Sequence, residues 1–150
     1  MNKTSVDEIL DYAIQAEQDA VDLYTGLAKT TKSPSARVAF KAFAAEEATH
    51  KKKLKTVKKG KTFLNSKQQV LDLKISDYTV AGELGDQPDY QEVLLFAMQQ
   101  EKAAFKLYTH LANKTDVPEI KELLLGLAQE EAKHKLAFEI EYDENIYQEN

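Results

Sequence analysis

Apolar residues recur at alternating steps of three and four along four segments of the chain, which is the spacing of one face of an α-helix. In the first and third segments the stripe consists of Val6, Leu10, Ala13, Ala20, Tyr24 and Leu27, and of Tyr90, Leu94, Ala97, Ala104, Tyr108 and Leu111. In the second and fourth it consists of Phe40, Phe43, Leu54 and Val57, and of Ile120, Leu124, Leu127 and Phe138. The pattern predicts four amphipathic helices whose apolar faces share one core.

Six ionisable residues continue these stripes at positions where apolar side chains are expected. They are Glu17, Glu47, His50, Glu101, Glu131 and His134. Each lies in phase with the apolar positions of its own helix, so all six side chains are predicted to face the core.

The chain also carries an internal duplication. Residues 13–28 read AIQAEQDAVDLYTGLA and residues 97–112 read AMQQEKAAFKLYTHLA, with nine of the sixteen positions identical. The same offset of 84 residues relates His50 to His134. Each half of the chain is therefore predicted to be one unit of two helices.

Capping residues and turns set the expected ends of the helices. The predicted start signals are Ser5, Asp89 and Asp116, each followed three residues later by a Glu, and Ser33 before Pro34. The first three have the spacing of a capping box, and a proline suits the first turn of a helix. Short turns near residues 29–32 and 113–115 make each helix pair an antiparallel hairpin.

The segment between the two hairpins has a different character. From about residue 59 to 88 the helical stripe fails and glycines interrupt it, while Val70 to Ile75 alternates like a short extended piece. We predict one long crossover between repeat 1 (about 5–58) and repeat 2 (about 89–147). The 150 residues then form one domain (1–150), an all-α antiparallel four-helix bundle.

Composition narrows the chemistry. The chain has no cysteine, which excludes disulfides and thiolate-bound metals, so a metal would need oxygen and nitrogen ligands. The net charge of −5 argues against nucleic acid as a partner, and we interpret the lysine runs at 51–53 and 58–61 as a solvated surface. Neither a signal peptide nor a membrane span is recognisable, so we expect a cytoplasmic protein.

The six in-phase residues have the arrangement of a dinuclear metal site. A Glu and a His three residues apart on one helix face present neighbouring side chains, as in Glu47/His50 and Glu131/His134. Two such pairs joined by one inward Glu from each remaining helix, here Glu17 and Glu101, make the ligand set of di-iron and di-manganese carboxylate bundles.

The charge of the predicted ligand set matches two divalent metal ions, because four carboxylates neutralise their four positive charges. Carboxylate and imidazole ligands are typical of iron sites, and manganese or zinc are the alternatives. We assign Glu47 and Glu131 as bridging ligands, because their helices also supply the histidines, and Glu17 and Glu101 as terminal ones. Two competing interpretations are that these carboxylates lie at the surface of slightly rotated helices, or that they are buried and protonated, since burial raises carboxylate pKa values.

Other polar residues lie near the predicted site. Tyr24 and Tyr108 follow Glu17 and Glu101 by two turns on the same face, where they would pack in the core, orient a ligand carboxylate of the opposite repeat, or do both. Two further carboxylates, one residue before the bridging pair, could hold the free imidazole nitrogens, but being off the stripe they are predicted to be solvated: Glu46 and Glu130. His110, off the core phase, is left out of the site.

On these residues the sequence resembles the rubrerythrin family of ferritin-like di-iron proteins. The motif ExxAxxxYxxLA occurs at residues 17–28 and 101–112, and EExxH at 46–50 and 130–134. The resemblance implies a ferritin-like bundle with an iron centre that reacts with hydrogen peroxide or dioxygen under oxidative stress. Ala104 stands where rubrerythrins have an additional carboxylate ligand, and without cysteine the chain has no rubredoxin domain.

The leading hypothesis is therefore a di-iron oxidoreductase that is reset by an external electron donor, such as a rubredoxin or a flavoprotein. Two alternatives stay open: an iron-handling or ferroxidase protein, and a helical interaction module with a structural metal. No catalytic residue beyond the metal centre is assigned. We expect a homo-oligomer, most simply a dimer.

Overall fold

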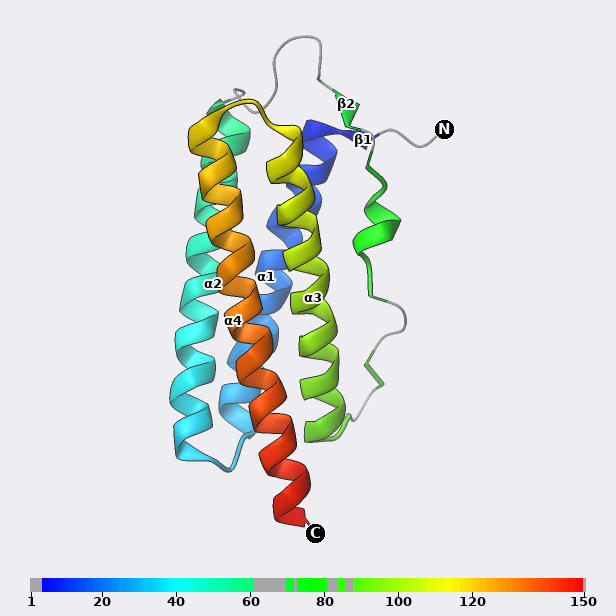
Figure 1. Cartoon of the computed structure of the whole chain (residues 1–150). Coiled ribbons are helices and arrows are strands. Elements are labelled where there is room, and N and C mark those ends of the chain that lie inside the picture. Colours follow the sequence, from blue (N-terminus) through cyan, green and yellow to red (C-terminus); the bar gives the residue numbers. More distant parts are fainter. Residues whose placement is uncertain (1–3, 61–69, 72, 81–83, 86–87, 150) are drawn as a thin grey trace.

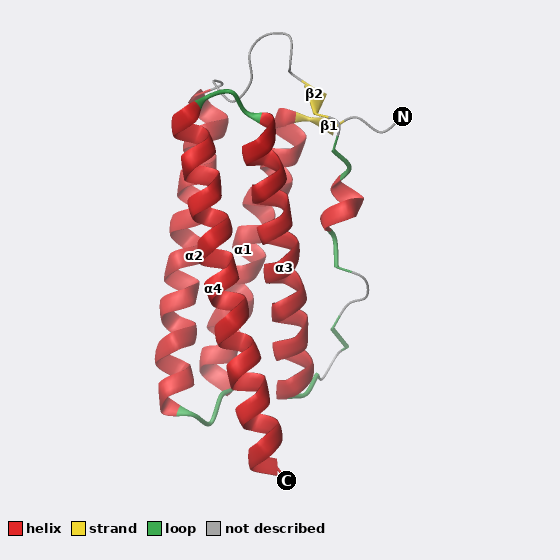
Figure 2. Cartoon of the chain, in the orientation of Figure 1, coloured by secondary structure: helices red, strands yellow, loops and turns green. Residues whose placement is uncertain are grey.

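The chain forms four long helices in a computed structural model, which describes residues 4–60, 70–71, 73–80, 84–85 and 88–149. The helices are α1 (Val6–Thr30), α2 (Pro34–Gly60), α3 (Tyr90–Lys114) and α4 (Pro118–Glu149). They lie side by side as one bundle, with α1 and α2 joined at one end and α3 and α4 at the opposite end (Figures 1 and 2). The predicted all-α four-helix bundle is confirmed.

The duplication extends to the helix boundaries. Adding 84 to the first residues of α1 and α2 gives the first residues of α3 and α4, and α1 and α3 both contain 25 residues. The two hairpins are therefore equivalent units. The long crossover returns the chain to the opposite end of the bundle, so α3 runs parallel to α2 and antiparallel to α1 (Figure 1).

The apolar stripes meet as predicted in a core that the polar site divides into two clusters. One cluster surrounds Leu54, Leu111 and Leu124 near the end of the bundle that holds the N-terminus of α1. The other surrounds Tyr24, Phe40 and Phe138 toward the opposite end. All of these side chains are buried, so both clusters exclude water from the middle of the bundle.

Three of the four predicted helix starts are confirmed by their hydrogen bonds. Ser5 and Asp89 accept from the amides of Glu8 and Glu92, at 3.1 and 2.7 Å, and Ser33 caps α2 by accepting from the Ala36 amide at 3.2 Å.

The start signal at Asp116 is wrong. The carbonyl of Val117 accepts the amide of Lys121 at 2.9 Å, so the cap position is Val117, whose side chain has no acceptor. Val117 is the repeat counterpart of Ser33, and the duplication, more than the capping-box spacing, predicts where α4 begins.

The crossover contains short elements that the sequence pattern identified only in part. Val70–Leu71 (β2) pairs antiparallel with Thr4–Ser5 (β1), a partner that we did not predict. The backbone of Lys74 is also extended, as predicted, but Ile75 is not, because Ile75–Tyr78 form a 3-10 helix, η1. This part of the crossover runs beside α3, where Tyr78 is buried in the core (Figure 1).

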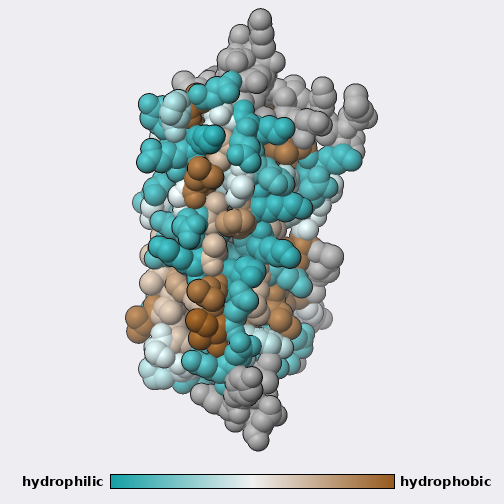
Figure 3. Space-filling model, viewed as in Figure 1, coloured by the Kyte–Doolittle hydropathy of each residue, from teal (hydrophilic) through white to brown (hydrophobic). Residues whose placement is uncertain are grey.

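The outer surface is mainly hydrophilic, with apolar side chains gathered in small patches on the face shown in Figure 3. Among the described residues, the most exposed of the large apolar side chains are Val38 on α2 and Leu136 and Ile140 on α4. None of the helices in the described part of the chain has the length and apolar composition needed to cross a membrane.

Candidate metal centre

All six in-phase polar residues meet in the middle of the bundle, and their exposed fractions are between 0 and 2%. Glu17 comes from α1 and Glu101 from α3, while α2 supplies Glu47 and His50 and α4 supplies Glu131 and His134. Ionisable side chains are rarely buried to this extent unless they are paired or bind a metal.

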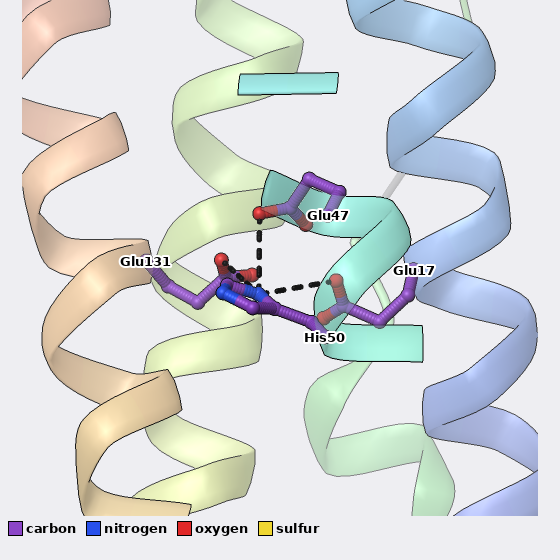
Figure 4. A group of neighbouring side chains, drawn as sticks. All are labelled: Glu17, Glu47, His50 and Glu131. Atoms are coloured by element: carbon purple, nitrogen blue, oxygen red, sulfur yellow. Dashed lines mark ion pairs between the residues drawn. The ribbon is translucent and has the colours of Figure 1, made fainter. Parts of the chain in front are cut away.

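The six residues form two groups with two members in common. Glu17, Glu47, His50 and Glu131 each offer one ligand atom within 4.8 Å of the others, and so do Glu47, Glu101, Glu131 and His134. Figure 4 shows the first group, with its three carboxylates around one imidazole. Because Glu47 and Glu131 belong to both groups, an ion in either group would lie next to both carboxylates.

The Nδ1 atom of each histidine faces the carboxylates. Nδ1 of His50 lies 3.4 Å from oxygens of Glu17 and Glu47 and 3.2 Å from Glu131. Nδ1 of His134 lies 3.0 Å from Glu47, 3.1 Å from Glu101 and 3.7 Å from Glu131. The two inward nitrogens therefore occupy equivalent places in the two groups.

Several atoms at the centre have no hydrogen-bond partner. They are Oε2 of Glu17, both oxygens of Glu47, Oε1 of Glu131 and Nδ1 of His50. An unpaired buried polar atom costs about 1–3 kcal/mol, and more when it is charged. Carboxylate oxygens and an imidazole nitrogen that converge without donors suit divalent cations, so these residues fit two metal ions.

The pKa values of five of the six clustered residues are raised, because the buried carboxylates have, among the described residues, no cation paired with them other than the histidines. Burial raises the pKa of Glu47, Glu101 and Glu131, and the neighbouring carboxylates raise those of Glu47 and Glu131 further. Burial alone lowers the histidine pKa values, but the carboxylates outweigh it and raise the pKa of His50 to about 9 and of His134 to about 10. The metal-free site therefore retains protons that cations would displace.

The two core tyrosines connect the repeats. The hydroxyl of Tyr24 donates to Oε1 of Glu101 at 2.6 Å, and the hydroxyl of Tyr108 donates to Oε1 of Glu17. Burial and the accepting carboxylate raise the pKa of both phenols, so each keeps its proton and donates it. Both rings are also buried in the core, which confirms their packing role. That the two hydroxyls orient metal ligands stays a prediction, which the bonds to Glu101 and Glu17 favour.

Glu46 and Glu130, which we predicted to be solvated, contact the histidines. Nε2 of His50 pairs with Glu130, and Nε2 of His134 pairs with Glu46, each across the seam between α2 and α4. The side chains of Glu130 and Glu46 are 42 and 50% exposed, respectively. This partial exposure agrees with their positions beside the apolar stripe of each helix, from which we predicted surface residues. The bond to His50 lowers the pKa of Glu130 despite partial burial, which keeps it an acceptor.

His110 lies outside the six-residue cluster, as expected. Its Nδ1 pairs with the hydroxyl of Tyr78 at 2.7 Å, beside the crossover. Lys51, in the lysine run of α2, donates to Gln18 on α1 at 2.7 Å, so this run is partly engaged in helix packing.

The sequence matches the family described as rubrerythrin over residues 8–86 and 92–150. Comparison with curated proteins gives no match.

Three solved structures are similar over nearly their whole length. A hypothetical protein from Pyrococcus furiosus has 25% identity and a TM-score of 0.74, covering 93% of this chain and 89% of that one. A Thermotoga maritima protein titled as a ferritin-like diiron-carboxylate protein has 17% identity and a TM-score of 0.73, covering 97 and 99%. An uncharacterised Magnetospirillum magnetotacticum protein has 23% identity and a TM-score of 0.59, covering 91 and 92%.

Proposed function

Because the chain belongs to the rubrerythrin family, we propose that its six core residues bind two iron ions and that the reduced centre transfers electrons to hydrogen peroxide or dioxygen. The observation that carries this proposal is the sharing of Glu47 and Glu131 between the two ligand groups. Two shared carboxylates, one terminal carboxylate for each ion and one imidazole for each ion form a complete and symmetrical donor set.

Each residue then has a defined role. Glu47 and Glu131 would hold both ions, Glu17 would hold the ion next to His50, and Glu101 would hold the ion next to His134. The histidines would bind through Nδ1, because their Nε2 atoms are already paired with carboxylates on the neighbouring helix. Such outer pairs fix the ring orientation and make the imidazole a stronger ligand.

Two ferrous ions held there would supply two electrons, which with two protons would convert one hydrogen peroxide to two waters or one dioxygen to hydrogen peroxide. The protein's part is to hold the carboxylates and exclude water. Tyr24 and Tyr108 each hold one oxygen of Glu101 and Glu17, so that the other oxygen of each carboxylate faces the histidine of its own group. The core clusters on both sides keep the site at a low dielectric constant.

An external donor must return the two electrons. Within the described residues the two histidine–carboxylate pairs are the bonded connections that lead from the site to a solvent-exposed side chain, at Glu46 and Glu130. We propose that a small redox protein, such as a rubredoxin or a flavoprotein, delivers electrons on this α2–α4 face.

The test combines metal analysis with rapid mixing. Protein purified without oxygen is expected to contain about two iron ions per chain, and its reduced form to oxidise much faster than free ferrous iron in the same buffer. A reduced rubredoxin should then restore the ferrous form. If oxidation is no faster than that of free iron, the redox proposal fails, and uptake of further iron beyond two ions would support iron handling instead.

A further inference from the structure

The six residues of the candidate centre are almost completely buried, so an oxidant needs a path to them. Two adjoining cavities lie along the seam between α1 and α3, on the side that the crossover covers. This seam is opposite the α2–α4 face, where Glu46 and Glu130, the carboxylate partners of the two buried histidines, are half-exposed.

The outer cavity is large. It has a volume of about 600 Å³ between α1, α3 and the crossover residues Thr79 and Val80. Its wall also includes the carboxylates of Asp19 and Asp22, while lysine and arginine do not occur among the described residues that line it. A cavity with this charge disfavours anions, superoxide among them, and admits neutral molecules.

The inner cavity is small and is separated from the candidate centre by Tyr108, whose hydroxyl donates to Glu17. Its volume is about 20 Å³, and its wall includes Ala104 and Tyr108. A cavity needs about 10–15 Å³ in the same measure to hold a single water. The inner cavity therefore has room for a molecule somewhat larger than one water and is too small for an organic substrate.

The two cavities meet at three residues. Tyr12, Ala16 and Gln100 line both of them. The hydroxyl of Tyr12 donates to the carbonyl of Tyr78 at 3.1 Å, which fixes the phenol ring at the boundary. On the far side of the inner cavity, Tyr108 is bonded to Glu17, one of the six clustered residues.

From the order of outer cavity, inner cavity and Tyr108 we infer that the inner cavity is a binding site for an uncharged oxidant of two heavy atoms, dioxygen or hydrogen peroxide. The oxidant enters through the outer cavity and passes Tyr12. The inference rests on the proposed function. It assigns Ala104 and Ala16 the role of keeping the passage open, because a larger side chain at either position would occupy the space.

The first test uses xenon, an apolar atom that reports dioxygen-sized cavities, on crystals of the full chain without added metal. Xenon is expected between Tyr12 and Tyr108, and its occupancy is expected to fall at least fivefold in Ala104→Val. The matched control is Ala137→Val, since Ala137 also follows a clustered residue by three positions, is half-buried and lines neither cavity. Absence of xenon from this position in the parent protein would overturn the inference.

The second test measures entry. Ala104→Val is expected to slow the oxidation of the reduced, iron-loaded protein by peroxide and by dioxygen at least tenfold with unchanged iron content, whereas Ala137→Val should oxidise at the parent rate. If one oxidant is slowed and the other is not, the cavity serves the slowed one. Parent-like rates of Ala104→Val with both oxidants would contradict the inference.

Two further outcomes separate the inference from the function on which it rests. If Ala104→Val does not fold, Ala16→Val blocks the same passage from α1 and is expected to give the same loss of xenon and of rate. If the reduced parent protein reacts with neither oxidant, the proposed function fails, while the xenon result still decides whether the cavity accepts a dioxygen-sized molecule.

Discussion

The hydroxyl of Tyr24, on α1, donates a hydrogen bond of 2.6 Å to Glu101, on α3, and so ties the first repeat to a candidate ligand of the second. The bond leaves one carboxylate oxygen of Glu101 to face His134 at 3.1 Å. A tyrosine of one repeat thus positions a carboxylate of the other, and Tyr108 makes the reciprocal contact to Glu17.

Tyr24→Phe is expected to lower metal affinity about tenfold, since removal of a group that orients a ligand costs on the order of 10–100-fold. A competition titration with a chelator measures the change. Tyr90→Phe is the control, because Tyr90 also donates to a carboxylate, Glu141, at 2.6 Å, but at the end of the bundle. Equal losses of affinity in the two variants would show that the effect is not specific to the site.

Glu131→Ala is expected to lose both metal ions, whereas Glu17→Ala is expected to retain at least one. Glu131 belongs to both ligand groups, and Glu17 belongs to one. Metal analysis of the purified variants, at matched folding by circular dichroism, compares them. Equal metal content in the two variants would contradict the assignment of Glu131 as a bridge.

Glu46→Gln and Glu130→Gln are expected to weaken metal binding by similar factors of about tenfold, because each removes the charge that supports one imidazole. Glu139→Gln, which breaks only the exposed pair with Lys135, serves as the control. Clearly unequal effects at Glu46 and Glu130 would mean that the two repeats do not contribute equivalent halves of the site.

The metal-free protein is expected to lose stability as pH rises from 6 to 9. The folded-state pKa values of Glu47, Glu101 and Glu131 lie above the ordinary value of 4.5, and those of His50 and His134, about 9 and 10, lie above 6.5. The folded protein therefore binds more protons than the unfolded chain in this window, and its stability falls with pH. Glu130, with a lowered pKa, has the opposite effect only in more acid solution.

Thermal unfolding in a chelator at several pH values measures this slope, and the stabilisation by added metal should increase over the same range as fewer protons compete. A metal-free midpoint that rises between pH 6 and pH 9 would be inconsistent with protonated carboxyl groups in the core.

The sequence by itself determined which side chains face the core. Helical phase is a local property, so the apolar stripes placed Glu17 and His50 with Leu10 and Leu54, and the 84-residue offset placed their counterparts in the second repeat. Local capping chemistry likewise located the start of α1 at Ser5 and of α3 at Asp89.

Only the tertiary structure decided what each inward or half-exposed side chain touches. Glu46 lies off the stripe of its own helix, and it reaches His134 because α2 and α4 pack at a distance and rotation that no single helix encodes. The same holds for the pairing of β1 with β2 and for the cavity beside Ala104, a small residue whose space is left empty by the packing of Tyr12 and Tyr108 around it. The periodicity of the sequence determines in which direction a side chain points from the axis of its own helix. A contact between helices also depends on how the two helix axes are placed relative to each other, and the packing of the whole core determines that placement.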